Sequence, residues 1–123
     1  METSLRLSLY SQKNYKGRRI RFKRGGVAIR DMHAFDFNNR LSSFRVSNLR
    51  EPDNVTLVLF SAANFKGKVR VFRGSQNIPR LSRFGFDNIT TSLILVCGRM
   101  SDETISQICR TGQIPKNILV ISD

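Results

Sequence analysis

The sequence is poor in the residues on which many catalytic and metal centres depend. It has no Trp, one His (His33) and two Cys (Cys97 and Cys109) in 123 residues. Two cysteines are too few for a disulfide framework, and no zinc-ligand spacing connects them with His33. They form one bridge if their Cα atoms lie within about 7 Å, and stay as two free thiols otherwise. The sequence also lacks a Ser-His-Asp or Cys-His constellation and a phosphate-binding glycine loop, so we expect no enzymatic activity.

Long apolar runs are also missing. No stretch approaches the roughly 18 apolar residues of a membrane-spanning helix, so we expect no membrane span. The N-terminal sequence METSLRLSLY does not match a signal peptide, because Arg6 interrupts a very short apolar region. Cytoplasmic residence is therefore the default expectation. With 40% hydrophobic residues and the length of one domain, the chain is expected to fold around a core.

Acidic residues are scarce. Nine Asp and Glu stand against 21 Lys and Arg, which gives a formal net charge of +12 at pH 7. The excess lies entirely in residues 1–98, because residues 99–123 hold three cations and three acids. Such a field attracts polyanions whatever the fold. Seven cations fall within residues 13–24: Lys13, Lys16, Arg18, Arg19, Arg21, Lys23 and Arg24.

The most informative feature present is an internal repeat. Residues 9–22, LYSQKNYKGRRIRF, match residues 59–72, LFSAANFKGKVRVF, at a constant offset of fifty. Residues 35–46, FDFNNRLSSFRV, match residues 84–95, FGFDNITTSLIL, at an offset of forty-nine. Two copies are too few for a solenoid, so the repeat predicts two packed supersecondary units.

Short runs within each copy predict β-strands. Ile20 and Phe22 alternate with cations, and residues 55–60 (VTLVLF) and 92–96 (SLILV) are apolar and β-branched. Gly, Asn and Pro residues punctuate these runs at intervals of roughly ten residues. This pattern indicates an antiparallel β-sandwich or barrel.

One strand of the repeat does not match its partner in phase. Ile20 and Phe22 are expected to point inward, but the residues fifty positions later are Arg70 and Phe72. Either a bulge shifts the second strand or the two copies use its faces differently. The sequence leaves this choice open.

Two motifs of the repeat resemble those of the βγ-crystallin family, in its microbial, calcium-binding form. The first is aromatic, four residues, aromatic, one residue, glycine, as in Tyr10 to Gly17 and in Phe60 to Gly67. The second is (Asn/Asp)-(Asn/Asp)-x-x-(Ser/Thr)-Ser, present as residues 38–43 and 87–92. The resemblance implies an all-β sandwich of two Greek-key motifs, about 4–49 and about 54–98, in a domain of residues 1–98.

The resemblance also implies up to two calcium ions, each bound between the two copies. Calcium takes six to eight hard oxygen ligands, including carbonyls, amides and hydroxyls. The final Ser43 and Ser92 are expected instead to hydrogen-bond within the fold. The alternative is a pair of Asn- and Ser-rich turns that have lost the metal. Carried over by position, the ligands are the side chains of Asn38, Asn39, Ser42, Asp87, Asn88 and Thr91 and the carbonyls of Ser11, Arg40, Ser61 and Ile89.

The charges around this expected site weaken it. Asp87 is the only carboxylate within the two six-residue motifs, and Arg40 lies inside the first. Ser11 and Ser61 stand where the family commonly has an acidic residue. A unit charge about 10 Å away in water costs a dication roughly 0.8 kcal/mol before screening. We therefore expect weak-to-moderate affinity, with Kd on the order of 10⁻⁵ to 10⁻³ M.

The alternative function is polyanion binding, with a degenerate metal site. Arg19, Arg21 and Lys23 alternate with apolar residues, so one strand face would present a ribbon of cations to nucleic acid, an anionic envelope polymer or acidic lipid. A solvated basic face is the simpler interpretation. The repeat uses most aromatic residues, so no exposed platform for base stacking is expected. The candidate residues are Lys13, Lys16, Arg18, Arg19, Arg21 and Lys23.

Residues 99–123 lie outside the resemblance and form a C-terminal extension. Ser101 is a suitable N-cap, Ile105 and Cys109 share one helical face, and Gly112 is a stop signal, which together predict a short helix. Residues 118–122 (ILVIS) predict a final strand. That strand is expected to join a sheet edge, to mediate self-association or to cover the sandwich, and the sequence does not choose among these.

Overall fold

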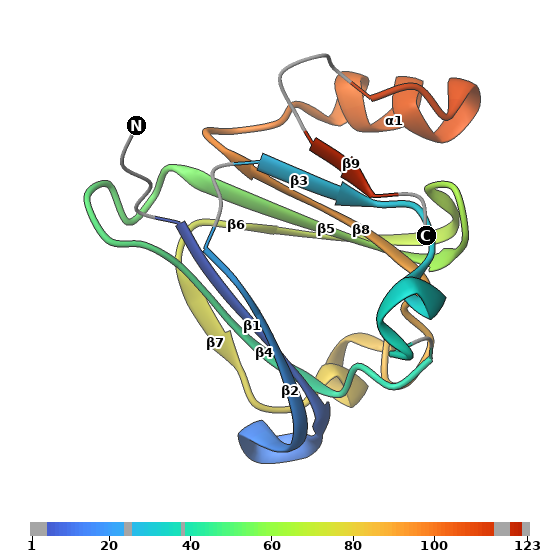
Figure 1. Cartoon of the computed structure of the whole chain (residues 1–123). Coiled ribbons are helices and arrows are strands. Elements are labelled where there is room, and N and C mark those ends of the chain that lie inside the picture. Colours follow the sequence, from blue (N-terminus) through green and yellow to red (C-terminus); the bar gives the residue numbers. More distant parts are fainter. Residues whose placement is uncertain (1–4, 24–25, 38, 115–118, 122–123) are drawn as a thin grey trace.

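The computed structural model describes residues 5–23, 26–37, 39–114 and 119–121 as a β-sandwich with one α-helix. Two sheets pack face to face in Figure 1. Sheet A has the strand order β2-β1-β4-β7, and sheet B the order β6-β5-β8-β3-β9. Sheet A consists of β1 (Leu5–Gln12), β2 (Lys16–Phe22), β4 (Ser43–Asn48) and β7 (Gln76–Ile78). Sheet B consists of β3 (Gly26–Ile29), β5 (Val55–Ala62), β6 (Lys66–Arg73), β8 (Ser92–Cys97) and β9 (Leu119–Ile121).

Each copy of the repeat contributes its third strand to the other sheet. β3 comes from the first copy but pairs with β8 of the second, and β7 comes from the second copy but pairs with β4 of the first. Three 3₁₀ helices connect the strands: η1 (Lys13–Tyr15), η2 (Met32–Phe35) and η3 (Leu81–Phe84). This exchange confirms the predicted pair of Greek keys and joins both copies around one core.

The two first hairpins have the same register, so no bulge separates them. Leu9 pairs with Ile20 in sheet A, and Leu59 pairs with Arg70 at the equivalent place in sheet B. Both hairpins also shift register at the same point, just before the bend. The phase difference between the copies therefore reflects a different use of the two strand faces.

Within the described residues, sheet B is the sheet with packed clusters on both faces. The central core between the sheets contains Leu7, Phe44, Leu57 and Leu93, all essentially inaccessible to solvent. A second cluster lies on the outer face of sheet B, where Val58 and Ile94 pack with Ile105 and Ile108 of α1 (Asp102–Thr111). Val71 packs against this cluster. The outer side of β6 therefore carries apolar residues such as Val71, because helix α1 covers that side.

Helix α1 confirms the predicted helix, including both of its caps. The Ser101 side chain accepts a hydrogen bond from the Thr104 N–H, and Gly112 ends the helix in a left-handed conformation. Lys66 donates to the carbonyl of Cys109 at the C-terminal end, where a cation is favourable. Arg73 binds Asp102 at the N-terminal end, 2.7 Å away. The helix is therefore anchored to β6 at both ends.

The final strand joins the edge of sheet B. β9 pairs in parallel with β3, with Ala28 opposite Val120. Cys97 and Cys109 are both free thiols. Among the described residues, no helix has the length and apolar character needed to cross a bilayer.

Candidate functional site

The two aromatic corners are built on left-handed backbone. In the first corner Asn14 and Tyr15 have φ of 60° and 62°, and in the second Asn64 and Phe65 have 58° and 62°. Asn tolerates this conformation better than most residues, which explains its place before each second aromatic ring. The rings then meet edge to face, with centroids 5.6 Å apart for Tyr10 and Tyr15.

One buried serine closes each corner. The Ser43 hydroxyl donates to the Gln12 carbonyl (2.6 Å) and accepts from the Tyr15 N–H (3.0 Å). Ser92 does the same with the Ala62 carbonyl (2.6 Å) and the Phe65 N–H (3.1 Å). The last residue of each six-residue motif thus has the structural role expected from the sequence.

The two six-residue motifs hydrogen-bond directly to each other. The backbone N–H of Asn39 donates to the Thr90 carbonyl (3.1 Å), and that of Asn88 donates to the Leu41 carbonyl (3.0 Å). Asn39 and Asn88 both have left-handed backbone, with φ of 56° and 57°. The second motif position therefore turns the chain so that its side chain reaches the opposite copy.

These bonds bring side-chain oxygens of the two motifs together in pairs. The Thr91 hydroxyl lies 3.2 Å from the Asn39 side-chain oxygen and 3.1 Å from the Ser61 carbonyl oxygen. In the other pair, the Ser42 hydroxyl donates to the Asn88 side-chain oxygen at 2.8 Å. In each pair the fifth position of one motif meets the second position of the other. Ser42 and Thr91 are buried, while Asn39 and Asn88 are exposed.

The Ser11 and Ser61 segments lie beside the fifth-position residues. The N–H of Ser42 donates to the Tyr10 carbonyl (3.0 Å), and the N–H of Thr91 donates to the Phe60 carbonyl (2.9 Å). The hairpin residue that follows each of these carbonyls is therefore next to the oxygen pair. Two similar arrangements result, one at each junction between the copies, and the hydroxyl-to-carbonyl contact is recorded for Thr91 with Ser61.

The remaining expected ligands surround these contacts. Asp87 is exposed, and its carboxylate accepts from the Asn88 amide at 3.3 Å. Arg40 is exposed and Ile89 half-buried. Asn38 lies outside the described residues. Within the described ranges, no group of three or more His, Cys, Asp or Glu side chains is placed to hold a metal ion. Any cation here would therefore depend on neutral oxygens and Asp87.

Thr90, inside the second motif, has a buried hydroxyl whose contribution to stability can be tested by substitution. Its hydroxyl is buried and has no hydrogen-bond partner within the described part of the chain. The equivalent position in the first copy is the buried Leu41. We expect Thr90→Val to raise the free energy of unfolding by about 1 kcal/mol in urea, because an unsatisfied buried hydroxyl is removed. Thr90→Ser should lower it, since a methyl group is lost while the hydroxyl stays; a stabilised Ser variant would contradict the prediction.

Arginines bind the 3₁₀ helices that lead into both motifs. Arg18 donates to the Phe35 carbonyl (2.7 Å) and lies 3.6 Å from the Asp36 carboxylate. Arg70 donates to the Phe84 carbonyl (2.7 Å). These guanidinium groups come from different repeat positions but occupy equivalent places. Sequence alignment of the copies could not reveal this because the two arginines are not matched residues.

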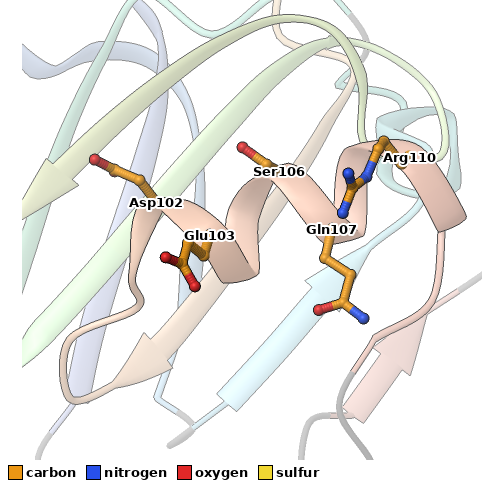
Figure 2. Close-up of a pocket in the computed structure, with 5 residues that line it drawn as sticks. All are labelled: Asp102, Glu103, Ser106, Gln107 and Arg110. Atoms are coloured by element: carbon orange, nitrogen blue, oxygen red, sulfur yellow. The ribbon is translucent and has the colours of Figure 1, made fainter.

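Two titratable groups outside the motifs have shifted pKa values. The His33 N–H, 2.9 Å from the Asp31 carboxylate, lowers the pKa of Asp31 against the opposing effect of burial. Burial raises the pKa of Cys109, opposed by the charge of Lys66. Neither group approaches the oxygen pairs through any recorded hydrogen bond. A shallow hollow in Figure 2 is lined by α1 side chains alone, and none belongs to a motif: Asp102, Glu103, Ser106, Gln107 and Arg110.

The six candidate polyanion-binding cations are all exposed, and Arg24 lies outside the described residues. Arg19 and Arg21 lie on the outward side of β2, since Ile20 and Phe22 pack on the core. The Arg18 guanidinium is partly engaged, because it donates a hydrogen bond to the Phe35 carbonyl of η2. Sequence reasoning missed Arg45 of β4, which alternates with the buried Phe44 and Val46 and joins the same face. Of the others, Lys13 lies in η1, Lys16 begins β2 and Lys23 follows it.

Comparison with solved structures identifies this architecture. A structure concerned with the evolution of the eye lens βγ-crystallin domain fold superposes with a TM-score of 0.65, at 19% identity over 80% of this chain and 91% of that one. The chain has the βγ-crystallin fold. A βγ-crystallin from Ciona intestinalis gives a TM-score of 0.57 at 18% identity, over 72% of this chain and 95% of that one.

A microbial structure with the βγ-crystallin fold is similar to the same degree. A domain from Clostridium beijerinckii gives a TM-score of 0.55 at 16% identity, over 73% of this chain and 95% of that one. No protein-family model matches the sequence. No curated protein matches it either. The likeness is thus one of fold, and the function has to be argued from the residues.

Proposed function

We propose that this protein is a non-enzymatic, calcium-binding member of the βγ-crystallin family with up to two ion sites. The observation that supports this is the reciprocal contact of fifth and second motif positions: Thr91 with Asn39, and Ser42 with Asn88. Each arrangement takes residues from both copies. An ion bound there would link the two Greek keys and stabilise the native state.

The donor set fits calcium. One site would use the Asn39 side chain, the Thr91 hydroxyl and the Ser61 carbonyl; the Thr91 oxygen lies 3.2 Å from the Asn39 oxygen and 3.1 Å from the Ser61 oxygen. Calcium accepts such neutral oxygen ligands together with water, whereas softer metals favour His or Cys. The second site would use Ser42, Asn88 and the Ser11 carbonyl. Asn38, Asp87 and the carbonyls of Arg40 and Ile89 are the further ligands expected from the motifs.

The net charge of +12 limits the affinity. Asp87 is the only carboxylate within the motifs, and Arg40 adds a cation beside them. We therefore keep the expected Kd on the order of 10⁻⁵ to 10⁻³ M, with structural stabilisation as the main effect.

Thermal unfolding in calcium against chelator tests this proposal. For a Kd of about 10⁻⁴ M, 1 mM calcium should add about 1.4 kcal/mol per occupied site, because the ion binds only the folded protein. The midpoint should rise by about 6 °C per site, followed by circular dichroism. Thr91→Val with Ser42→Ala should abolish the rise. Equal midpoints of the parent protein in calcium and in chelator would overturn the calcium function.

A second candidate function is polyanion binding, and one observation favours it. The outer face of sheet A remains uncovered by α1 and carries outward arginines on β2 and β4. The outer face of sheet B is apolar and lies under α1. This contrast between the two sheets supports a role for the basic face beyond solubility, and such a role is compatible with calcium binding elsewhere.

A further inference from the structure

The outer face of sheet A is a continuous basic surface. Because Leu7, Ile20 and Phe44 face the core, their neighbours along each strand face outward. In one cross-strand row Arg21 lies opposite Ser8, which lies opposite Arg45, which lies opposite Asn77. We name this surface the basic sheet face; it comprises Arg6, Ser8, Tyr10, Arg19, Arg21, Arg45, Ser47 and Asn77.

Three arginines of the basic sheet face have no acidic partner among the ion pairs of the described residues. None of its eight residues is Asp or Glu. Arg19, Arg21 and Arg45 take part in none of the ion pairs recorded for the described residues, which instead use Arg18, His33 and Arg73. The positive charge of these three arginines is therefore available to an external anion.

An aromatic platform lies at one end of this face. The Arg45 guanidinium stacks over the Tyr15 ring, 4.1 Å from its centroid, and the Tyr10 ring meets Tyr15 edge to face. Both tyrosines are half-buried, whereas their counterparts Phe60 and Phe65 are completely buried on the side of α1. The corner on sheet A thus leaves its two tyrosines partly accessible, whereas the corner on sheet B is closed to solvent.

We propose that the basic sheet face binds single-stranded nucleic acid. This rests on the second candidate function, polyanion binding, and specifies its partner. Arginines separated by one residue on β2 contact phosphates, while the planar guanidinium of the exposed Arg45 and the partly accessible tyrosine rings stack with unpaired bases. Duplexes, sulfated polymers and lipid headgroups offer the charge but no unpaired base. The stack is the feature that favours a single strand over these.

The test compares four anions in 100 mM salt. The probes are a labelled single-stranded 15-mer, the duplex of the same sequence, heparin, and phosphatidylserine vesicles, measured by anisotropy and competition. The single strand should bind at least about tenfold more tightly than the duplex. Intrinsic tyrosine emission, corrected for absorption, should fall on binding, because the only two tyrosines lie at this platform and no Trp is present.

Variants separate charge from stacking. Arg45→Lys keeps the charge but loses the planar group, so single-strand affinity should fall about fivefold to tenfold while heparin affinity stays unchanged. Arg19→Ala with Arg21→Ala should weaken both ligands and lower the salt slope for the single strand by about 1.4. Arg99→Ala with Arg110→Ala removes two exposed cations on the α1 side and should leave binding unchanged.

The outcomes distinguish the two levels of the proposal. Equal affinity for single strand and duplex, with no effect of Arg45→Lys, would overturn the single-strand assignment and leave polyanion binding in place. Vesicles that outcompete the oligonucleotide would overturn it in favour of lipid. Absence of binding to all four probes would overturn both.

Discussion

Replacing Ser92 by Ala is expected to lower the free energy of unfolding by about 3 kcal/mol. The Ser92 hydroxyl is completely buried and bonds both the Ala62 carbonyl and the Phe65 N–H. Its loss leaves two backbone groups without a partner beside the buried Phe65 ring, and each costs about 1–3 kcal/mol. Urea unfolding followed by circular dichroism measures the difference.

The equivalent serine of the first copy supplies an internal comparison. Ser43 makes the same two bonds, but its partners Gln12 and Tyr15 are exposed and half-buried, respectively. Water can replace the lost hydroxyl there, so Ser43→Ala should cost only about 1–2 kcal/mol. Ser82→Ala, on an exposed side chain, serves as the control and should stay within about 0.5 kcal/mol of the parent. Equal losses for Ser43 and Ser92 would show that burial of the corner does not control the energy.

The repeat made the sandwich predictable because it encodes local geometry twice. Matched positions in the two hairpins have the same register, and the left-handed corner residues are Asn followed by an aromatic residue in both copies. The predicted helix and final strand followed likewise from caps and composition. These features depend on residues close together in the sequence.

The position of helix α1 over the outer face of sheet B could not be predicted from the sequence in the same way. Its position depends on contacts between α1 and strands more than thirty residues earlier, such as Ile105 with Val58. A signal was nevertheless present in the sequence: residues 55–60 (VTLVLF) are apolar at every position except Thr56, whereas residues 5–10 (LRLSLY) alternate. In the structure residues 55–60 are buried at every position, and residues 5–10 alternate between buried and half-buried. A strand with two apolar faces requires cover on both sides. Of the places expected for the final strand, β9 takes the sheet edge, and the cover over the face is supplied by α1 instead.

The sequence predicted which residues form the candidate site, but it did not predict how they are arranged in space. The motifs identify oxygens, but only the structure shows that the second position of each reaches the fifth position of the other. The partial accessibility of the tyrosine corner was not predicted, because the repeat treats Tyr10 and Phe60 as equivalent. Tyr10 has a hydroxyl and lies on the face of sheet A that is partly open to solvent. Phe60 has none and is buried on sheet B beneath α1.

Replacing Gly67 by Ala is expected to cost about 3–4 kcal/mol. Gly67 has φ of +82°, a region that costs an L-residue about 1–2 kcal/mol. An added Cβ would also lie 2.3 Å from the Ser61 hydroxyl oxygen and 3.1 Å from the Ala62 nitrogen. Moving Ser61 breaks its 2.7 Å hydrogen bond from the Lys68 N–H and displaces the segment whose carbonyl faces Thr91. Backbone strain and overpacking therefore add at this position.

Gly85 separates these two contributions. It has φ of +69°, but nothing lies within 4 Å of an added Cβ, so Gly85→Ala should show the conformational cost alone, about 1 kcal/mol. In a Ser61→Ala background the hydroxyl is absent, and Gly67→Ala should lose about 1 kcal/mol less than in the parent. Urea unfolding of the four proteins in this cycle measures the coupling. A coupling energy of zero would mean that the corner requires glycine for its backbone alone, and that the Ser61 side chain does not fix the position of the carbonyl proposed to bind calcium.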